Sequence, residues 1–384
     1  MIVCLPKHDR AQTPTDYRPI TLPNDDNKLL AKILAHRLRT LLADYLWKAQ
    51  FCGIPGKTIL DAVATVRDAI AQSEMTHTPL CVLSLDFRKA FDRVAHLYLF
   101  TILKAYDLQD SFVDRIKRMY QDATTAVQIN GHIAGTVPLR CSVRQGCSLS
   151  MALFALCINP LLHYHDTHLD GIQFGRTGNR VAVVAYADDV TIFVSQREDF
   201  RIVRDALQCY EKASGARLNI QKSNALAIGE WIGTGNDFGV DFVPNMQILG
   251  VTFSNTLERT AHDSWSRTAA QIRSQVQQAY GRKMSTPQRI NYVHNTLLVP
   301  IWYVAQTLPS PEIYTRQLTT AVQWYLWSGV IFRLPLSTSQ KPLMQGGWAL
   351  LNIAVKCQPY YYGACGSKVR KREPRQPTGF KPGD

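Results

Sequence analysis

The segment that constrains this chain most is an apolar stretch, residues 181–195, with two adjacent aspartates at its centre. Its sequence, VAVVAYADDVTIFVS, has β-branched residues on both sides of Ala187, Asp188 and Asp189. This pattern predicts two short strands joined by a tight turn that carries both carboxylates. An Asp-Asp pair at a turn is usually turn chemistry alone. The pair therefore needs a further acid before it indicates a catalytic site.

A second buried strand supplies such an acid. Residues 79–87, PLCVLSLDF, form a short apolar run in which Asp86 comes near the end. A carboxylate at such a place costs free energy unless a cation or another partner compensates it. If the two strands are neighbours in one sheet, Asp86, Asp188 and Asp189 converge. Mg²⁺ prefers hard oxygen ligands, and two such ions can clamp both oxygens of a phosphoryl transfer. Asp92, shortly after Asp86, is interpreted as a helix-capping or structural acid.

The remaining patterns predict a mixed α+β chain. Residues 1–27 indicate irregular or short-strand structure, and Asn130-Gly131 indicates a hairpin between strands at 124–131 and 136–140. Further strands are expected at about 225–228 and 247–252. Apolar residues at helical spacing predict helices at about 28–45, 59–72, 96–106, 110–120, 149–163, 198–213, 262–281, 286–304 and 311–328.

Composition narrows the class of partner. Lysine and arginine number 43 against 30 acidic residues, a net charge of +13, which suits nucleic acid but also an anionic membrane or a ribosome. No apolar run reaches the roughly 18 to 20 residues of a spanning helix, so we expect no membrane partner. The nine cysteines show no zinc spacing, and Cys81 and Cys157 are expected to be buried thiols. We therefore expect an intracellular protein, in the nucleus or the cytoplasm.

Several motifs give the chain a family resemblance. LDFRKAFDRV (85–94), RQGCSLS (144–150) and YADD (186–189) resemble the palm motifs of non-LTR (LINE-type) retrotransposon reverse transcriptases. Further matches bracket them from about residue 2 to 355: DYRPITL (16–22), KLLAKILAHRL (28–38), QFCGIPGKTILDA (50–62), RLNIQKS (217–223), ILGV (248–251) and GGWALLN (346–352). Their fixed order makes coincidence an inadequate explanation.

The resemblance implies an α+β, right-hand polymerase with fingers, a palm built on a small antiparallel sheet, and a helical thumb. Fingers and palm would occupy residues 1–257 and the thumb 258–335, followed by a C-terminal extension (336–365) and a basic disordered tail (366–384). The implied activity is that of an RNA-directed DNA polymerase. Its partners would be an RNA template, a DNA primer, their RNA–DNA duplex and deoxynucleoside triphosphates. The oligomeric state is left open.

The resemblance also implies a metal site. Asp86 and Asp188 would bind two Mg²⁺ ions, with Mn²⁺ as an alternative. Asp189 would be a third, less engaged carboxylate, and the backbone carbonyl of Phe87 would complete the metal shell. Lys222 would stand near the pyrophosphate leaving group as charge stabiliser or proton donor; the alternative is a solvated turn lysine.

Four further residues would face the nucleotide. The ring of Phe91 would lie under the sugar and exclude a 2′-hydroxyl; the alternative is a core phenylalanine. Gln145 and Gly146 would touch the nucleotide and template, since a position without a side chain allows close approach. Arg18 would contact the triphosphate through its guanidinium; the alternative is a surface charge. Weaker candidates for nucleic-acid backbone contacts are Lys28, Lys57 and Arg144.

The chain departs from the family pattern at several places. Ser148 and Met151 stand where proline is usual, and Lys57 replaces a common arginine. Neither an endonuclease nor a Cys/His knuckle is found in this sequence, which opens inside a fingers motif, so we expect a truncated copy. Two alternatives follow from this interpretation. One is a decayed, RNA-binding relic of such an element, and the other is an intron-maturase-like reverse transcriptase.

Overall fold

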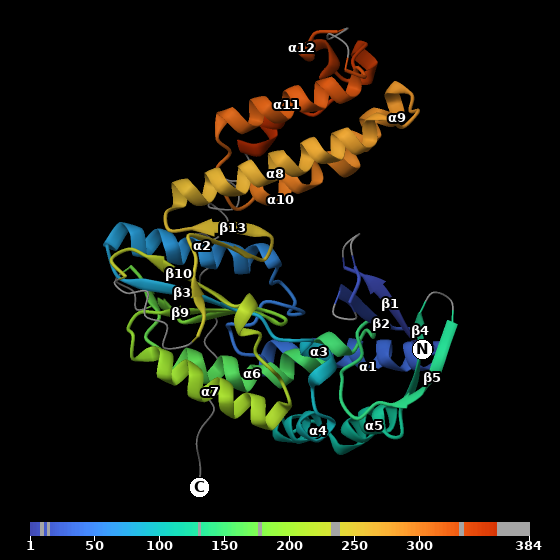
Figure 1. Ribbon diagram of the computed structural model, residues 1–384, viewed down its shortest axis with the longest axis vertical. Coiled ribbons are helices and arrows are strands. Elements are labelled where there is room, and N and C mark those ends of the chain that lie inside the picture. Colours follow the sequence, from blue (N-terminus) through green and yellow to red (C-terminus); the bar gives the residue numbers. More distant parts are fainter. Residues whose placement is uncertain are drawn as a thin grey trace. The chain divides into compact units, whose positions relative to one another are not determined.

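The computed structural model describes residues 1–7, 11–13, 16–129, 132–175, 179–231, 239–329 and 334–358. The chain divides into two compact units (Figure 1). Unit 1 comprises residues 1–250 and 254–256, and unit 2 comprises residues 251–253 and 257–384. The predicted tail at 366–384 and part of the predicted extension lie outside the described residues.

A five-stranded sheet forms the centre of unit 1. Its strand order is β11-β10-β3-β9-β8, and the strands are β11 (Asp241–Phe242), β10 (Asn224–Ile228), β3 (Leu80–Leu85), β9 (Asp189–Val194) and β8 (Val183–Tyr186). β3 pairs antiparallel with both β9 and β10, as do β8 and β9 with each other. The nearly continuous apolar run of β3 is explained by this central place, because the strand is buried on both faces. The strands predicted at 79–87, 181–195 and 225–228 are therefore confirmed.

Helices cover both faces of this sheet (Figure 1). α2 (Ile59–Thr76) lies on one face, and α6 (Ser150–His168) and α7 (Asp199–Ser214) lie on the other. α2 begins with a capping box in which the side chains of Thr58 and Asp61 each accept the other's backbone N–H. α7 ends at Gly215, whose φ of 80° is the left-handed conformation expected of a terminating glycine.

The other helices of unit 1 also match the predicted ranges. They are α1 (Asp25–Tyr45), α4 (His96–Ala105) and α5 (Asp110–Tyr120), whereas the short helix α3 (Ala90–Arg93) was not predicted. In α1, Leu34, Leu38 and Leu42 are buried in the core. Cys81 and Cys157 are fully buried thiols, as predicted, and burial raises the pKa of Cys81 to about 12.

A second sheet in unit 1 joins two distant parts of the chain. Its order is β2-β1-β4-β5, with β2 (Tyr17–Thr21), β1 (Ile2–Pro6), β4 (Thr124–Ile129) and β5 (His132–Pro138). β1 runs parallel to β4, and β4 pairs antiparallel with β5. The predicted hairpin is confirmed, although its return strand begins earlier than expected; the Asn130-Gly131 turn lies outside the described residues.

One strand prediction was wrong, and one pair of strands was missed. The strand expected at 247–252 is two strands, β12 (Asn245–Ile248) and β13 (Val251–Ser254), because Leu249 and Gly250 both have positive φ. The hairpin strands β6 (Ile172–Phe174) and β7 (Asn179–Val181) were not predicted.

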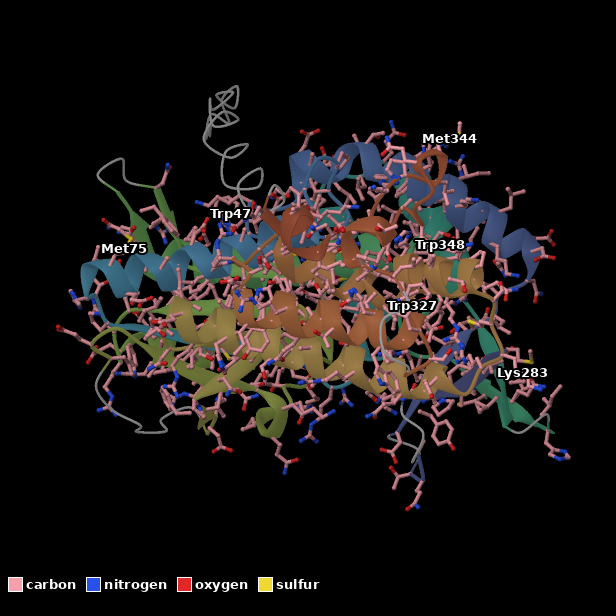
Figure 2. The ribbon with its side chains drawn as sticks, turned by 90° about the horizontal axis from the view of Figure 1, so that it is seen from above. Trp47, Met75, Lys283, Trp327, Met344 and Trp348 are labelled. Atoms are coloured by element: carbon pink, nitrogen blue, oxygen red, sulfur yellow. The ribbon has the colours of Figure 1, made fainter. Side chains whose placement is uncertain are left out.

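Apart from the β13 residues 251–253, the described elements of unit 2 are helical. α8 (Leu257–Tyr280) and α11 (Glu312–Leu326) pack along each other. The helix expected at 286–304 is broken into α9 (Thr286–Tyr292), a π-turn (Val293–Leu297) and α10 (Val299–Ala305), where Pro300 lacks a backbone N–H to donate. A short helix, α12 (Leu336–Ser339), follows, and Met344 beyond it is almost wholly exposed (Figure 2).

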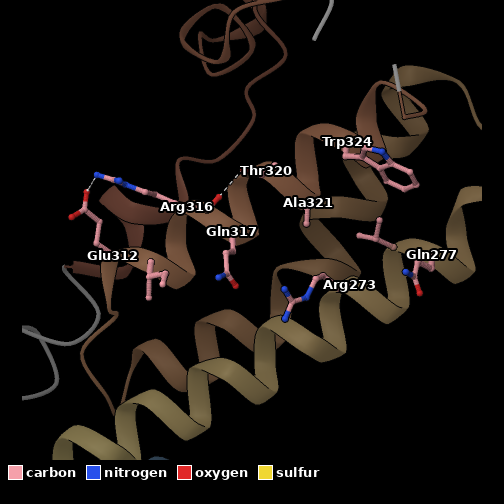
Figure 3. Close-up of a pocket in the computed structure, with 10 residues that line it drawn as sticks. Arg273, Gln277, Glu312, Arg316, Gln317, Thr320, Ala321 and Trp324 are labelled. Carbon is pink, nitrogen blue, oxygen red and sulfur yellow. Dashed lines mark hydrogen bonds and ion pairs between the residues drawn. The ribbon is translucent and has the colours of Figure 1, made fainter. Parts of the chain in front are cut away.

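A groove of about 850 Å³ lies in unit 2 between α8 and α11 (Figure 3). Glu312 is the one acid among the described residues that line it, and it forms an exposed ion pair with Arg316 on the same helix. This described lining therefore lacks the carboxylate cluster that the sequence predicts. None of the helices in the described ranges is long and apolar enough to span a bilayer.

Candidate active site

The structure brings Asp86, Asp188 and Asp189 together at one end of the five-stranded sheet. Leu85 of β3 is paired with Val190 of β9, so the next residue of one strand and the preceding residue of the other lie side by side. Asp86 is thereby placed beside Asp189. Asp188 occupies the turn between β8 and β9, next to the pair formed by Tyr186 and Asp189. Three carboxylates thus share one end of the sheet, where these strands end, and this end is called the active edge below.

The electrostatics of this edge favour a bound cation. Burial, followed by the nearby charge of Asp86, raises the pKa of Asp188, while the guanidinium of Arg18 lowers it. Burial raises the pKa of Asp189 to about 6, with further contributions from Asp188 and Asp86. Asp189 keeps one side open to solvent, so water screens part of this repulsion. A positive charge among the three side chains would remove the remainder.

Asp86 is held by residues that the sequence motifs alone do not single out. The Asn219 side-chain amide donates to Asp86 Oδ2 at 2.9 Å, and the Asn219 backbone N–H donates to the Asp86 carbonyl at 2.7 Å. The buried hydroxyl of Ser223 accepts the Asp86 backbone N–H at 3.1 Å. Both residues belong to the RLNIQKS motif. These contacts orient one carboxylate oxygen of Asp86 and leave the other available.

Gln50 holds the turn that carries the other two aspartates. Its fully buried Oε1 accepts the backbone N–H groups of Phe51, Cys52 and Ala187 at 3.0 to 3.1 Å. Ala187 has a φ of 57°, an unusual conformation for a residue with a side chain, and the bond from Gln50 helps to fix it. Gln50 begins the QFCGIPGKTILDA motif, but nothing in the sequence pattern indicates this role.

The backbone carbonyl of Phe87 is available on the side away from the RLNIQKS motif. Phe87 faces Leu218 in an antiparallel bridge in which the neighbouring residues make the hydrogen bonds: Arg88 N–H to the Arg217 carbonyl, and Asn219 N–H to the Asp86 carbonyl. In such a non-hydrogen-bonded pair, each residue's own N–H and C=O point away from the partner strand. The geometry is therefore compatible with the metal-ligand role predicted for this carbonyl.

The residues expected to meet the nucleotide lie on several segments around the aspartates. Arg18 is exposed on β2, near enough to Asp188 to affect its pKa. Gly146 has a φ of 95°, and a Cβ there would lie 2.9 Å from the Thr21 carbonyl. The close approach that Gly146 permits in this structure is thus to β2, while its contact with template stays a prediction. The Gln145 backbone carbonyl accepts the Thr21 N–H at 2.8 Å, which joins the same two segments.

Phe91 and Asp92 lie on α3, the short helix that follows Asp86 in the chain. The half-buried Phe91 ring stacks on Phe154 at 4.5 Å, so one face packs against the core and the gate role stays a prediction. Asp92 lies within α3 and accepts a hydrogen bond from the Gln145 side chain at 3.0 Å. It is therefore a structural acid and not a helix cap, and burial raises its pKa.

The lysine and arginine candidates differ in where their charges lie. Lys222 is exposed at the end of a short 3₁₀ turn, Ile220–Lys222, beside Asn219. Lys28 is exposed and pairs with Asp25. Lys57 instead donates to the carbonyls of Lys48 and Gln50, and burial lowers its pKa to about 8. The buried Arg144 stacks over Tyr120 at 4.9 Å and donates to the Met119 carbonyl. Lys57 and Arg144 thus have internal structural partners.

The described residues contain no set of three histidine, cysteine, aspartate or glutamate side chains arranged to hold one metal ion. A metal at this edge would need two carboxylates, the Phe87 carbonyl and oxygens from substrate or water. Mg²⁺ commonly binds in that way, through one or two carboxylates together with substrate phosphates. The donor set at this edge is therefore suited to such an ion.

A largely antiparallel sheet, in which only β10 and β11 run parallel among the described strands, with acids at one end, helices behind it and a separate helical unit, is the architecture of a right-hand polymerase. The chain belongs to the reverse transcriptase (RNA-dependent DNA polymerase) family, whose pattern matches residues 5–253. The fold is also similar to the RNA-dependent RNA polymerase of a human picobirnavirus, with a TM-score of 0.50 and 11% identity, over 96% of this chain and 64% of that one.

The related sequences come from retrotransposons. The chain is 30% identical over 362 residues to the transposon TX1 uncharacterized 149 kDa protein of Xenopus laevis. It is 25% identical over 372 residues to the Pol polyprotein from the type-2 retrotransposable element R2DM of Drosophila melanogaster. Both alignments cover 91% of this chain but only 27% and 34% of those proteins. The predicted retrotransposon-type reverse transcriptase is therefore confirmed, and the chain spans about a third or less of these relatives.

Proposed function

We propose that this chain is the polymerase core of a non-LTR retrotransposon reverse transcriptase, which extends a primer 3′-hydroxyl with deoxynucleotides along an RNA template. The observation that carries the proposal is the register that places Asp86 beside Asp189, with Asp188 in the adjoining turn. Family membership supports the same reaction.

Asp86 and Asp188 would hold two Mg²⁺ or Mn²⁺ ions, with the Phe87 carbonyl completing the shell and Asp189 adding negative charge beside them. When bound, such ions lower the pKa of the attacking hydroxyl and stabilise charge on the leaving pyrophosphate. The chain's own contribution is positioning. Asn219 orients the Asp86 carboxylate, and Gln50 fixes the turn that presents Asp188.

The remaining candidates would bind and select the nucleotide. Arg18 would contact the triphosphate, which fits its exposed guanidinium close to Asp188. Phe91 would use its free ring face against the sugar, and Gln145 and Gly146 would line the path of the template. Lys222 would place its ammonium near the leaving pyrophosphate, which suits its exposure beside Asn219.

Primer extension tests the metal-site assignment. An RNA template, a DNA primer, Mg²⁺ and deoxynucleotides are combined with the wild-type chain, with Asp188→Ala, or with Asp205→Ala, an exposed aspartate on α7. We expect Asp188→Ala to lose extension by at least about a thousandfold, because metal stabilisation is worth several kcal/mol. RNA binding should persist in both variants. Extension by Asp188→Ala at the wild-type rate would refute the assignment.

Sugar discrimination tests the Phe91 gate. Replacing Phe91 with alanine opens space beneath the sugar, so ribonucleotide incorporation should rise about tenfold relative to deoxynucleotide incorporation, or about 1.4 kcal/mol. Single-nucleotide insertion kinetics with matched dNTP and rNTP pairs measure this ratio. A lower melting temperature together with an unchanged ratio would instead make Phe91 a packing residue against Phe154.

A further inference from the structure

Unit 1 has a pocket of about 620 Å³ with a strongly basic lining, in addition to the groove described in unit 2. Four arginines line it, and they come from three parts of the chain: Arg88 follows β3, Arg93 ends α3, Arg204 lies on α7, and Arg217 follows α7. All four are exposed to solvent. None of the three active-site aspartates lines this hollow, which we call the arginine pocket.

Little negative charge offsets these arginines. Glu211 is the one acid among the described lining residues, and it lies 3.7 Å from Arg217. Arg204 makes a long, exposed contact of 3.6 Å with Asp205. Arg93 Nε donates to a backbone carbonyl, and in the described part of the chain neither Arg93 nor Arg88 has a carboxylate partner. Guanidinium groups gathered in one hollow repel one another, and an anion would relieve that repulsion.

The shape and chemistry of the pocket fit a chain of phosphates. The pocket follows one face of α7 from Arg204 to Glu211, a length of about 10 Å, which exceeds a single phosphate group. A guanidinium binds phosphate oxygens through two parallel hydrogen bonds. Leu218 and the exposed side chain of Ile220 add apolar surface on which a ribose or base can pack.

We propose that the arginine pocket binds the phosphate backbone of a single-stranded RNA segment, separately from the site of nucleotide addition. Recognition would be independent of base sequence, because charge and apolar contact read no base edges. The pocket also adjoins the active site: the Arg88 backbone N–H donates to the Arg217 carbonyl, two residues before the asparagine that holds Asp86. RNA in the pocket would thus rest against the segment that positions Asp86.

The test measures RNA binding without metal or deoxynucleotides, so its result does not depend on polymerase activity. A labelled oligouridylate is titrated with the wild-type chain and with the triple variant Arg88→Gln, Arg93→Gln, Arg204→Gln. The matched control replaces three other exposed arginines with glutamine, namely Arg118, Arg197 and Arg201, and so removes the same amount of charge. Arg217 is kept because it pairs with Glu211.

We expect the pocket variant to raise the Kd about tenfold or more, and the control to change it by less than about threefold. The slope of log K against log salt should fall by about 2 in the pocket variant, at about 0.7 for each phosphate that the three arginines no longer neutralise. Crosslinks from 4-thiouridine RNA to the peptide around Leu218 should disappear as well. Equal weakening in both variants, or none in either, would overturn the proposal.

Two further measurements keep the result interpretable. Thermal melting shows whether the triple variant is folded; if it is not, the three single substitutions replace it, each expected to raise the Kd about twofold to threefold. Nucleotide kinetics exclude the alternative ligand. A raised KM for deoxynucleotides with unchanged RNA affinity would mean that the pocket serves a triphosphate, and the RNA assignment would be wrong.

Discussion

The segment at residues 45–52 is held at its two ends by polar groups of different kinds. At its start, Asn159 Oδ1 on α6 accepts the Trp47 backbone N–H at 2.6 Å. The buried Asp166 accepts the Trp47 indole N–H at 2.7 Å and pairs with Lys48 at 3.1 Å (Trp47 is labelled in Figure 2). At its end, Gln50 accepts three backbone N–H groups, one of them from the turn that carries Asp188.

The two ends differ in role: the hydrogen bonds at the start of the segment serve stability, and those at its end also serve function. On α6, the acid is buried and its partners lie within the protein, so its hydrogen bonds serve the fold. At the turn, Gln50 is satisfied through its oxygen, but Asp188 and Asp189 have no cationic side chain within ion-pair distance among the described residues. Charges that the fold positions without pairing are the ones available to a ligand.

Of the substitutions compared below, replacing Gln50 with alanine should have the largest effect on stability. Two buried backbone N–H groups, those of Cys52 and Ala187, would lose their acceptor, whereas the Phe51 N–H keeps the Ala185 carbonyl at 2.9 Å. At about 1 to 3 kcal/mol for each buried unsatisfied group, partly offset by water, the free energy of unfolding should fall by about 3 kcal/mol. Primer extension should also fall at least tenfold, because the turn at Ala187 is no longer fixed. Chemical denaturation and extension assays measure the two effects.

Asp166→Ala is the matched control for Gln50→Ala. It removes the acceptor of the Trp47 indole and of Lys48, so it should cost about 2 kcal/mol of stability. Extension by the folded fraction should stay within about twofold of wild type. If Asp166→Ala and Gln50→Ala reduced the extension rate equally, the two ends of the segment would not differ in function.

The sequence predicted the site where local patterning determines it. The apolar runs at 79–87 and 181–195 are dense enough in β-branched residues to identify strands, and a tight turn necessarily brings Asp188 and Asp189 to its tip. The register that places Asp86 beside Asp189 follows from burying both strands in one sheet. Helix α7 was likewise predictable, because Gly215 marks its end.

The sequence could not predict the partners that hold the site. Gln50 reaches Ala187 across 137 residues, and Asn219 reaches Asp86 across 133. Such contacts depend on how the segments pack, which no local period encodes. The arginine pocket was missed for the same reason, since its charges come from separate segments. The break in the helix expected at 286–304 could have been predicted from the sequence, because Pro300 indicates a helix break. The prediction gave more weight to the apolar periodicity of the segment.

The pH dependence of stability tests whether the buried polar groups of α6, His165 among them, serve the fold. Burial lowers the pKa of this fully buried imidazole to about 4, against about 6.5 in an unfolded chain. Below pH 6.5 the unfolded state binds the proton first, so stability is lost as the pH falls towards 4. Between pH 7 and pH 5, the free energy of unfolding of the wild type should fall by about 2 kcal/mol more than that of His165→Leu. Parallel slopes for the two proteins in denaturant titrations would contradict the burial argument.

Asn219→Ala should have the smallest effect on stability and a selective effect on rate. The substitution removes the amide that holds Asp86 Oδ2, while the backbone bond from residue 219 to the Asp86 carbonyl remains. Because residue 219 is half-buried, the free energy of unfolding should change by less than about 1 kcal/mol. The extension rate should fall about tenfold and need more Mg²⁺ to saturate, since a metal ligand is no longer oriented. Asn224→Ala at the start of β10, which removes only a side-chain hydrogen bond to the Lys222 carbonyl, is the control. An unchanged Mg²⁺ requirement in Asn219→Ala would show that the fold positions Asp86 without the Asn219 amide. The hydrogen bond at the active edge would then serve the fold, as the hydrogen bonds of Asp166 on α6 do.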